Sequence, residues 1–96
     1  SEDVAAQAHQ SFANIARTLA AARVSFSDLV RVTCYITDAD DYPVLMPVFK
    51  QYLGPNPPAA TTLIAQLTDP RIKIEIEAMA RRNNPVRNRN IGKGND

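Results

Sequence analysis

Apolar and polar side chains alternate without interruption from Arg71 to Ala80. A period of two over this length predicts a β-strand with one apolar and one charged face. The charged face fits a sheet surface in solvent, and it fits equally a face that meets another subunit, which would place Glu75 in a cleft. The apolar face consists of Ile72, Ile74, Ile76, Ala78 and Ala80, and the other face of Arg71, Lys73, Glu75, Glu77 and Met79.

Two stretches have the spacing of amphipathic helices. Residues 3–23 place apolar side chains three and four positions apart, and Ser1 or Asp3 can cap the first turn. Residues 42–53 form the second predicted helix, which ends at Gly54 and the prolines that follow it. The apolar stripe of the first helix consists of Val4, Ala8, Phe12, Ile15, Ala16 and Leu19.

Two further strands are predicted. Residues 59–67 are small and β-branched, and residues 29–37 alternate. Because a helix connects them, these two strands can pair in parallel through a right-handed crossover. A tight turn at residues 68–70 predicts that the strands at 59–67 and 71–80 pair as a hairpin. The apolar side of the strand at 29–37 consists of Val30, Val32, Cys34 and Ile36.

The order helix, strand, helix, strand, strand predicts an α/β (α+β) two-layer sandwich, with both helices on one face of a mixed sheet. The other face then has no cover, and its Thr and Tyr side chains indicate that it contacts another copy of the chain. We expect residues 1–81 to form this domain. Residues 82–96 contain almost no apolar side chains and are expected to form a flexible basic tail.

Composition narrows the functional classes. The chain has 96 residues and a formal net charge of +1, so electrostatics give no reason to expect a nucleic-acid partner. No apolar run approaches the roughly 18 residues that a membrane helix needs. The single cysteine, Cys34, rules out an internal disulfide and favours a reducing compartment. Because the chain opens Ser1-Glu2-Asp3 without a signal peptide, we expect a cytoplasmic protein.

Two isolated side chains have ordinary structural interpretations. The alternation places Cys34 in the core as a small apolar residue. His9, the only histidine, is expected to be an exposed helix residue, because no second metal ligand accompanies it. No metal site is predicted.

Several motifs together resemble the Rid family of reactive intermediate deaminases, also called the YjgF family or the L-PSP endoribonuclease family. The resemblance runs in order from the first helix to Ala80, and its most specific parts are a Pro-Ala pair and the closing Ile-Glu-Ile-Glu-Ala signature. In this chain the motifs are Val32-Thr33-Cys34-Tyr35-Ile36-Thr37-Asp38, Asp41-Tyr42, Pro58-Ala59-Ala60-Thr61-Thr62 and Ile74-Glu75-Ile76-Glu77-Ala78-Met79-Ala80.

The resemblance implies a chorismate-mutase-like fold in a homotrimeric barrel. Three sheets face inward, the helices lie outside, and clefts between neighbours hold the active sites. Catalytic members hydrolyse enamines and imines to ammonia and a 2-keto acid, and they need no metal or cofactor. Family members begin with a β-hairpin that this sequence lacks. We therefore expect the chain to be a fragment, to receive the hairpin from another chain, or to complete its sheet differently.

Position by position, the resemblance implies that Glu75 orients or activates the attacking water. The family's substrate-clamping arginine is replaced by Ala60, which cannot bind a carboxylate. Thr62 stands where many members carry a small cysteine or threonine, and Met46 where some place an asparagine. The remaining candidates fit a cleft lining or, equally, ordinary strand residues at an interface; they are Tyr35, Thr61 and Thr62.

We therefore expect hydrolysis of a small enamine, imine or related C–N metabolite at clefts between the subunits of a homotrimer. Because the clamp is missing, the substrate need not be a 2-imino acid. The alternative is a non-catalytic trimer that binds a ligand or a partner. A weaker alternative is an endoribonuclease.

Overall fold

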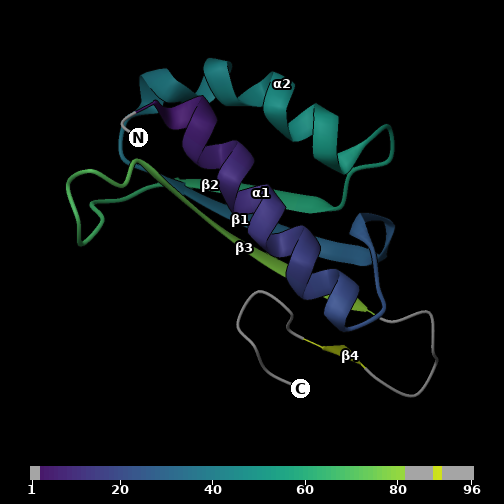
Figure 1. The fold of residues 1–96 in the computed structure, drawn as a ribbon. Helices are drawn as coiled ribbons and strands as arrows, with labels where there is room; N and C mark the ends of the chain where they lie inside the picture. Colours follow the sequence, from purple (N-terminus) through teal and green to yellow (C-terminus); the bar gives the residue numbers. More distant parts are fainter. Residues whose placement is uncertain (1–2, 82–87, 90–96) are drawn as a thin grey trace.

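The computed structural model describes residues 3–81 and 88–89, and these form two layers. Both helices lie on one side of a four-stranded sheet with the strand order β2-β1-β3-β4 (Figure 1). This arrangement confirms the predicted two-layer sandwich with both helices on one face of a mixed sheet. The elements are α1 (Val4–Ala21), β1 (Leu29–Ile36), α2 (Tyr42–Leu53), β2 (Ala59–Ile64), β3 (Ile74–Arg81) and β4 (Asn88–Arg89), with short 3-10 turns at Phe26–Asp28 and Ala39–Asp41.

Helix α1 begins at the predicted cap. The Asp3 carboxylate accepts hydrogen bonds from the backbone N–H groups of Ala5 and Ala6, at 2.9 and 3.3 Å, which satisfies two donors that the first turn leaves unpaired. The apolar stripe packs against the sheet and helix α2. Its buried members are Val4, Ala8, Phe12, Ile15 and Leu19.

Strand β1 is the centre of the sheet. It pairs in parallel with β2 and antiparallel with β3, so the predicted crossover through α2 is confirmed and the predicted hairpin between β2 and β3 is wrong. The end of β1 is held from both sides. The N–H of Ala65 donates to the carbonyl of Ile36 at 2.9 Å, and the N–H of Thr37 donates to the carbonyl of Lys73 at 3.2 Å. Residues 65–73 therefore cross from one side of β1 to the other instead of forming a tight hairpin.

Strand β3 begins three residues later than predicted, at Ile74. The preceding residues form a turn around Asp69, whose carboxylate accepts a hydrogen bond from the N–H of Arg71 at 2.9 Å and pairs with its guanidinium at 2.8 Å. Local bonds of this kind compete with strand pairing. Consequently Ile72 is 44% exposed, and the apolar face of the strand starts at Ile74. Strand β2 is likewise shorter than the predicted 59–67.

A bulge changes the alternation at the start of β1. Leu29 pairs with Ala80 and Arg31 with Met79, so two steps along β1 match one step along β3. The additional residue shifts the phase of the strand. Leu29 is therefore buried, and Val30, predicted to be on the core side, is 44% exposed.

An aromatic cluster joins the two helices. Phe12 of α1 stacks on Tyr52 of α2 with ring centroids 4.6 Å apart, and it makes edge contacts with Phe26 and Phe49. His9 Nδ1 forms a 2.8 Å hydrogen bond with the Tyr52 hydroxyl. His9 is half-buried, so the prediction of an exposed histidine is wrong.

Cys34 is 1% exposed in the core, as predicted. No helix in the described part of the chain has the length and apolar character needed to cross a membrane. The predicted tail, residues 82–96, lies outside the described residues except for β4, which pairs with Ala80 and Arg81.

Candidate functional site

The sheet register separates the predicted site residues into two groups. Strand residues that are direct partners share a face of the sheet. Tyr35 is the partner of Glu75, and Thr33 is the partner of Thr61, so these side chains belong to the face without helices. The remaining candidates belong to the helix-covered side. Ala60 and Thr62 pair there with Val32 and Cys34, both of which are buried beneath the helices, and Met46 lies on α2.

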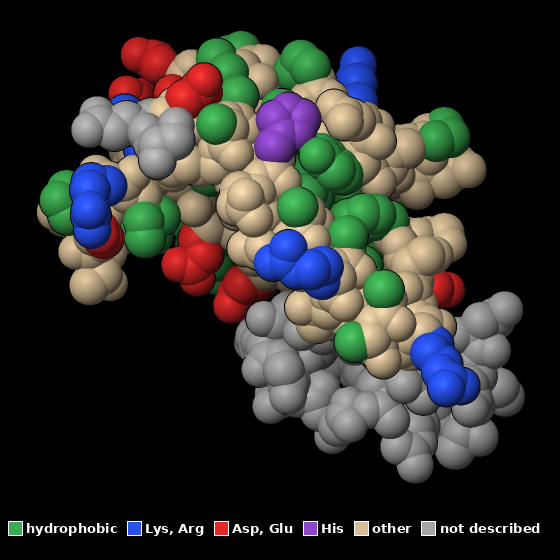
Figure 2. Space-filling view, in the orientation of Figure 1, with side chains coloured by type: hydrophobic (Ala, Val, Ile, Leu, Met, Phe, Trp, Pro, Cys, Tyr) green, Lys and Arg blue, Asp and Glu red, His purple; other side chains and the backbone are tan. Residues whose placement is uncertain are grey.

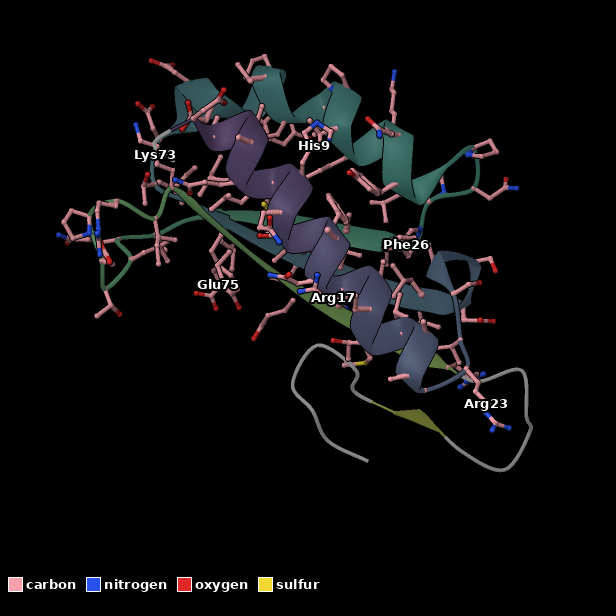
Figure 3. All side chains as sticks on the ribbon, in the orientation of Figure 1. His9, Arg17, Arg23, Phe26, Lys73 and Glu75 are labelled. Carbon is pink, nitrogen blue, oxygen red and sulfur yellow. The ribbon has the colours of Figure 1, made fainter. Side chains whose placement is uncertain are left out.

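Glu75 has an exposed carboxylate that points away from both helices (Figure 3). Within residues 3–81 and 88–89 it takes part in no hydrogen bond and no ion pair. Glu77, the next residue on the same face, is already engaged, because it accepts a 3.0 Å hydrogen bond from the Tyr35 hydroxyl. Of these two neighbouring carboxylates, Glu75 is the one available to a water molecule or a ligand.

The two carboxylates also affect Tyr35. Its hydrogen bond to Glu77 raises the pKa of the phenol above the ordinary value, and desolvation and the negative charges of Glu77 and Glu75 act in the same direction. Tyr35 therefore remains a neutral hydrogen-bond donor at physiological pH. The Tyr35 hydroxyl donates its hydrogen bond to Glu77. Tyr35 therefore does not donate to Glu75, although it lies opposite Glu75 in the strand register.

Glu75 is among the residues that border an open cavity of about 630 Å³ between α1 and β3, although its carboxylate belongs to the opposite face of the sheet. Figure 2 shows acidic side chains at this edge, below α1, where Figure 3 labels Glu75. Gln7 of α1 fixes the segment that leads into β3. Its side-chain amide donates to the carbonyl of Arg71, and its amide oxygen accepts from the N–H of Lys73, both at 2.8 Å. The start of β3, and with it Glu75, is thereby anchored to the first helix.

A second cavity, of about 680 Å³, lies between α2 and the outer strand β2. We call it the α2–β2 groove. It brings together three of the predicted residues, with two apolar neighbours and one lysine. These six residues are Met46, Phe49, Lys50, Leu53, Ala60 and Thr62.

Lys50 is a residue of this groove that the sequence interpretation did not name. It is the sole charged side chain among the residues that line the α2–β2 groove. The available signal was its spacing, because Lys50 follows Met46 by four residues and side chains four apart lie on one helix face. That signal has meaning only when the position of β2 beside α2 is known.

The two cavities lie on opposite sides of the central strand β1, because β2 and β3 flank it. A single copy of the chain therefore does not bring Glu75 to Ala60, Thr62 or Met46. Among the residues that the structure places, no group of three or more His, Cys, Asp or Glu side chains is arranged to hold a metal ion.

Comparisons with known proteins agree with this fold. The family model described as Endoribonuclease L-PSP matches residues 1–82. The putative reactive intermediate deaminase TdcF of Escherichia coli is 33% identical over 81% of this chain and 63% of its own. The human 2-iminobutanoate/2-iminopropanoate deaminase is 32% identical over 80% of this chain and 56% of its own.

A solved structure gives the same result. A member of the YjgF/YER057c/UK114 family from Mycobacterium tuberculosis superposes with a TM-score of 0.79 at 30% identity, over 83% of this chain and 69% of that protein. The chain spans less than two thirds of the length of the two curated relatives above. It belongs to the Endoribonuclease L-PSP family, which is the Rid or YjgF family that its sequence motifs resemble.

Proposed function

We propose that the protein hydrolyses a small enamine or imine, or a related C–N bond, with Glu75 as the general base. The observation that carries this proposal is that the Glu75 carboxylate is exposed and has no hydrogen-bond partner within the described residues. The sequence resemblance assigns Glu75 the family's water-activating position, its side chain is exposed, and it lacks the hydrogen bond that occupies Glu77. Relatives named as deaminases support the reaction class.

The chemistry requires one base and a means of holding the substrate. The Glu75 carboxylate accepts a proton from water as the oxygen adds to the carbon of a protonated imine. The product is a carbinolamine. Its nitrogen takes up the proton from Glu75. The C–N bond then breaks with its electron pair on the departing ammonia while the Glu75 carboxylate accepts the hydroxyl proton, so a carbonyl compound forms, and that proton passes on to solvent or to the ammonia. The Thr62 hydroxyl, in the α2–β2 groove, is suited to hold the substrate by a hydrogen bond.

We further propose that the site forms between copies of the chain in a homotrimer. The separation of Glu75 from the α2–β2 groove supports this arrangement, because the groove of one copy needs a carboxylate from another. The face without helices also carries Leu63, which is 45% exposed. An apolar side chain on an uncovered sheet face is suited to a protein contact.

The direct test measures ammonia release from enamines that a PLP-dependent dehydratase generates in the assay. The protein should accelerate release, and Glu75→Gln should reduce the acceleration by about 10²-fold or more. Glu77→Gln is the matched control, since its amide oxygen can still accept the bond from Tyr35, and its rate should stay near that of the unchanged protein. Absence of acceleration by the unchanged protein would overturn the proposal.

A non-catalytic binding protein is the second candidate, and the observation in its favour is Ala60 in place of the arginine. A non-catalytic binding protein would bind a metabolite without accelerating ammonia release. RNA cleavage that persists in highly purified Glu75→Ala protein would instead favour a ribonuclease, as the description of the family states.

A further inference from the structure

The outer edge of β3 is paired only at its end. Strand β4 pairs with Ala80 and Arg81, and none of the described strands lies beside residues 74–79 on that side (Figure 1). We propose that residues 90–95 of this chain continue β4 along the outer edge of β3 and cover the cavity between α1 and β3. The inference concerns how the sheet is completed, and it does not depend on the proposed reaction.

The backbone of β3 offers hydrogen bonds on this outer side. The N–H of Thr37 donates to the carbonyl of Lys73, so Lys73 bonds towards β1. In an antiparallel pair this direction alternates, and every second residue of β3 therefore directs its N–H and C=O groups away from β1. These residues are Ile74, Ile76 and Ala78. Ile74 and Ala78 are buried, and buried backbone groups are nearly always paired.

The pairing of β4 sets the register of the segment that follows it. Arg89 is the partner of Ala80 in an antiparallel ladder. The same ladder, continued, places Ile91 opposite Ala78 and residues 93 and 95 opposite residues 76 and 74. These are the positions whose backbone groups point outward, so each of them gains a hydrogen-bonded partner.

The segment also has the length of the unpaired edge. The Gln7 side chain already occupies the backbone just before this edge, because it bonds to the carbonyl of Arg71 and the N–H of Lys73, both at 2.8 Å. The unpaired edge therefore begins at Ile74. In register, residues 90–95 run from the end of β4 to this point, and six extended residues span about 20 Å.

One face of the segment is suited to the cavity. The register places Ile91 beside Ala78, on the side of the sheet that the helices cover. Ile15 of α1 and Ile76 of β3 line the cavity there, and an apolar side chain that covers them gains free energy by removing apolar surface from water. Lys93 lies two positions further on the same face. Polar side chains of α1 at the same cavity can accept or surround its ammonium group; they are Gln10, Ser11 and Asn14.

The other face of the segment leaves the carboxylates open. The register places Gly92 opposite Glu77 and Gly94 opposite Glu75. Direct strand partners share a face, and glycine has no side chain to lie over its neighbour. A strand of this sequence therefore closes the sheet edge without covering Glu75. A long side chain at either glycine position would lie beside the carboxylate instead.

A pair of engineered cysteines tests the register. Met79→Cys with Asn90→Cys places the two thiols on one face in a non-hydrogen-bonded pair, with Cα atoms about 4.5 Å apart, which suits a disulfide. Mild oxidation should link them within one chain, and peptide mapping detects the bond. Met79→Cys with Ile91→Cys is the matched control, since its thiols point to opposite faces and should link at least about tenfold more slowly. Equal linking in the two variants, or a bond between two copies of the chain, would overturn the inference.

Amide hydrogen exchange tests the pairing itself. A protein that stops at Arg89 should exchange the amides of Ile74, Ile76 and Ala78 about tenfold faster than the full chain, while the amides of α1 report that the fold is retained. Ile91→Pro removes an N–H that faces β3 and should speed exchange at Ala78. Asn90→Pro removes an N–H that faces away and should not. Exchange that is unchanged by both truncation and Ile91→Pro contradicts the proposed strand.

Discussion

Burial of Cys34 changes the acidity of its thiol. The side chain is 1% exposed, and desolvation raises the pKa of the thiol to about 11, because the thiolate would lose its hydration in the core. A cysteine in this state is a weak nucleophile. Its position between β2 and β3, in the middle of the sheet, gives it a structural function.

The raised pKa predicts a loss of stability in alkali. Between about pH 9 and pH 11 the folded protein keeps the Cys34 proton while the unfolded chain releases it. The unfolded state binds fewer protons in this window, so the free energy of unfolding falls as the pH rises, by up to roughly 2–3 kcal/mol. Urea denaturation at pH 8 and at pH 10.5 measures the change. The Cys34→Ala variant should lose less stability over the same interval, and equal losses in the two proteins would contradict the assignment.

At the scale of the element, Gly54 determines where α2 ends and the path to β2 begins. Its φ of 71° and ψ of −167° define a backbone region that only glycine adopts readily. A Cβ at this position would contact nothing within 4 Å, so the cost of a substitution comes from the backbone alone. We predict that Gly54→Ala lowers the free energy of unfolding by about 1–3 kcal/mol.

A second substitution at Gly54 tests whether backbone strain causes the loss of stability. Asparagine tolerates the left-handed helical region but not an extended ψ at positive φ, so Gly54→Asn should be as destabilising as alanine. Gln51→Ala, on the exposed surface of α2, should change stability by less than about 0.5 kcal/mol. Thermal or urea denaturation of the three variants distinguishes strain at Gly54 from general weakening of the helix end.

The spacing of apolar residues correctly predicts an element when that spacing alone decides which side of the element is buried. The stripe of α1 and the alternation of β3 each indicate which side faces the core. Two features depended on more than a local pattern. The bulge at Val30 depends on the pairing of β1 with β3, and the placement of β1 between β2 and β3 depends on which strands compete for its edges.

The same limit applies to the site. The motif around Glu75 identified the carboxylate, but only the hydrogen bond from Tyr35 to Glu77 shows why Glu75 is the available one. The sequence named Ala60, Thr62 and Met46 separately. These three residues lie with Lys50 in one groove because α2 is placed over β2. The spacing of residues along the chain does not predict that placement.

At the scale of the whole molecule, the two halves of the proposed site lie at opposite edges of one sheet. The α2–β2 groove would supply the binding surface, and β3 would supply the Glu75 carboxylate. The proposed homotrimer, if cyclic, would join the groove of each copy to the Glu75 edge of the next and produce three equivalent sites. In that proposed assembly every site would contain residues of two chains.

This arrangement predicts complementation between two impaired variants. Glu75→Gln retains its groove and Thr62→Val retains its carboxylate, so each protein alone should release ammonia slowly at low substrate concentration. When the two are unfolded, mixed in equal amounts and refolded together, about a quarter of the sites combine an intact groove with an intact Glu75 from the neighbouring copy. Ammonia release should rise towards a quarter of the unchanged protein's rate. If both residues acted within one chain, no mixed assembly would contain an intact site and the rate would remain at the mean of the two variants. Light scattering on the same samples checks that the refolded protein has the mass of a trimer.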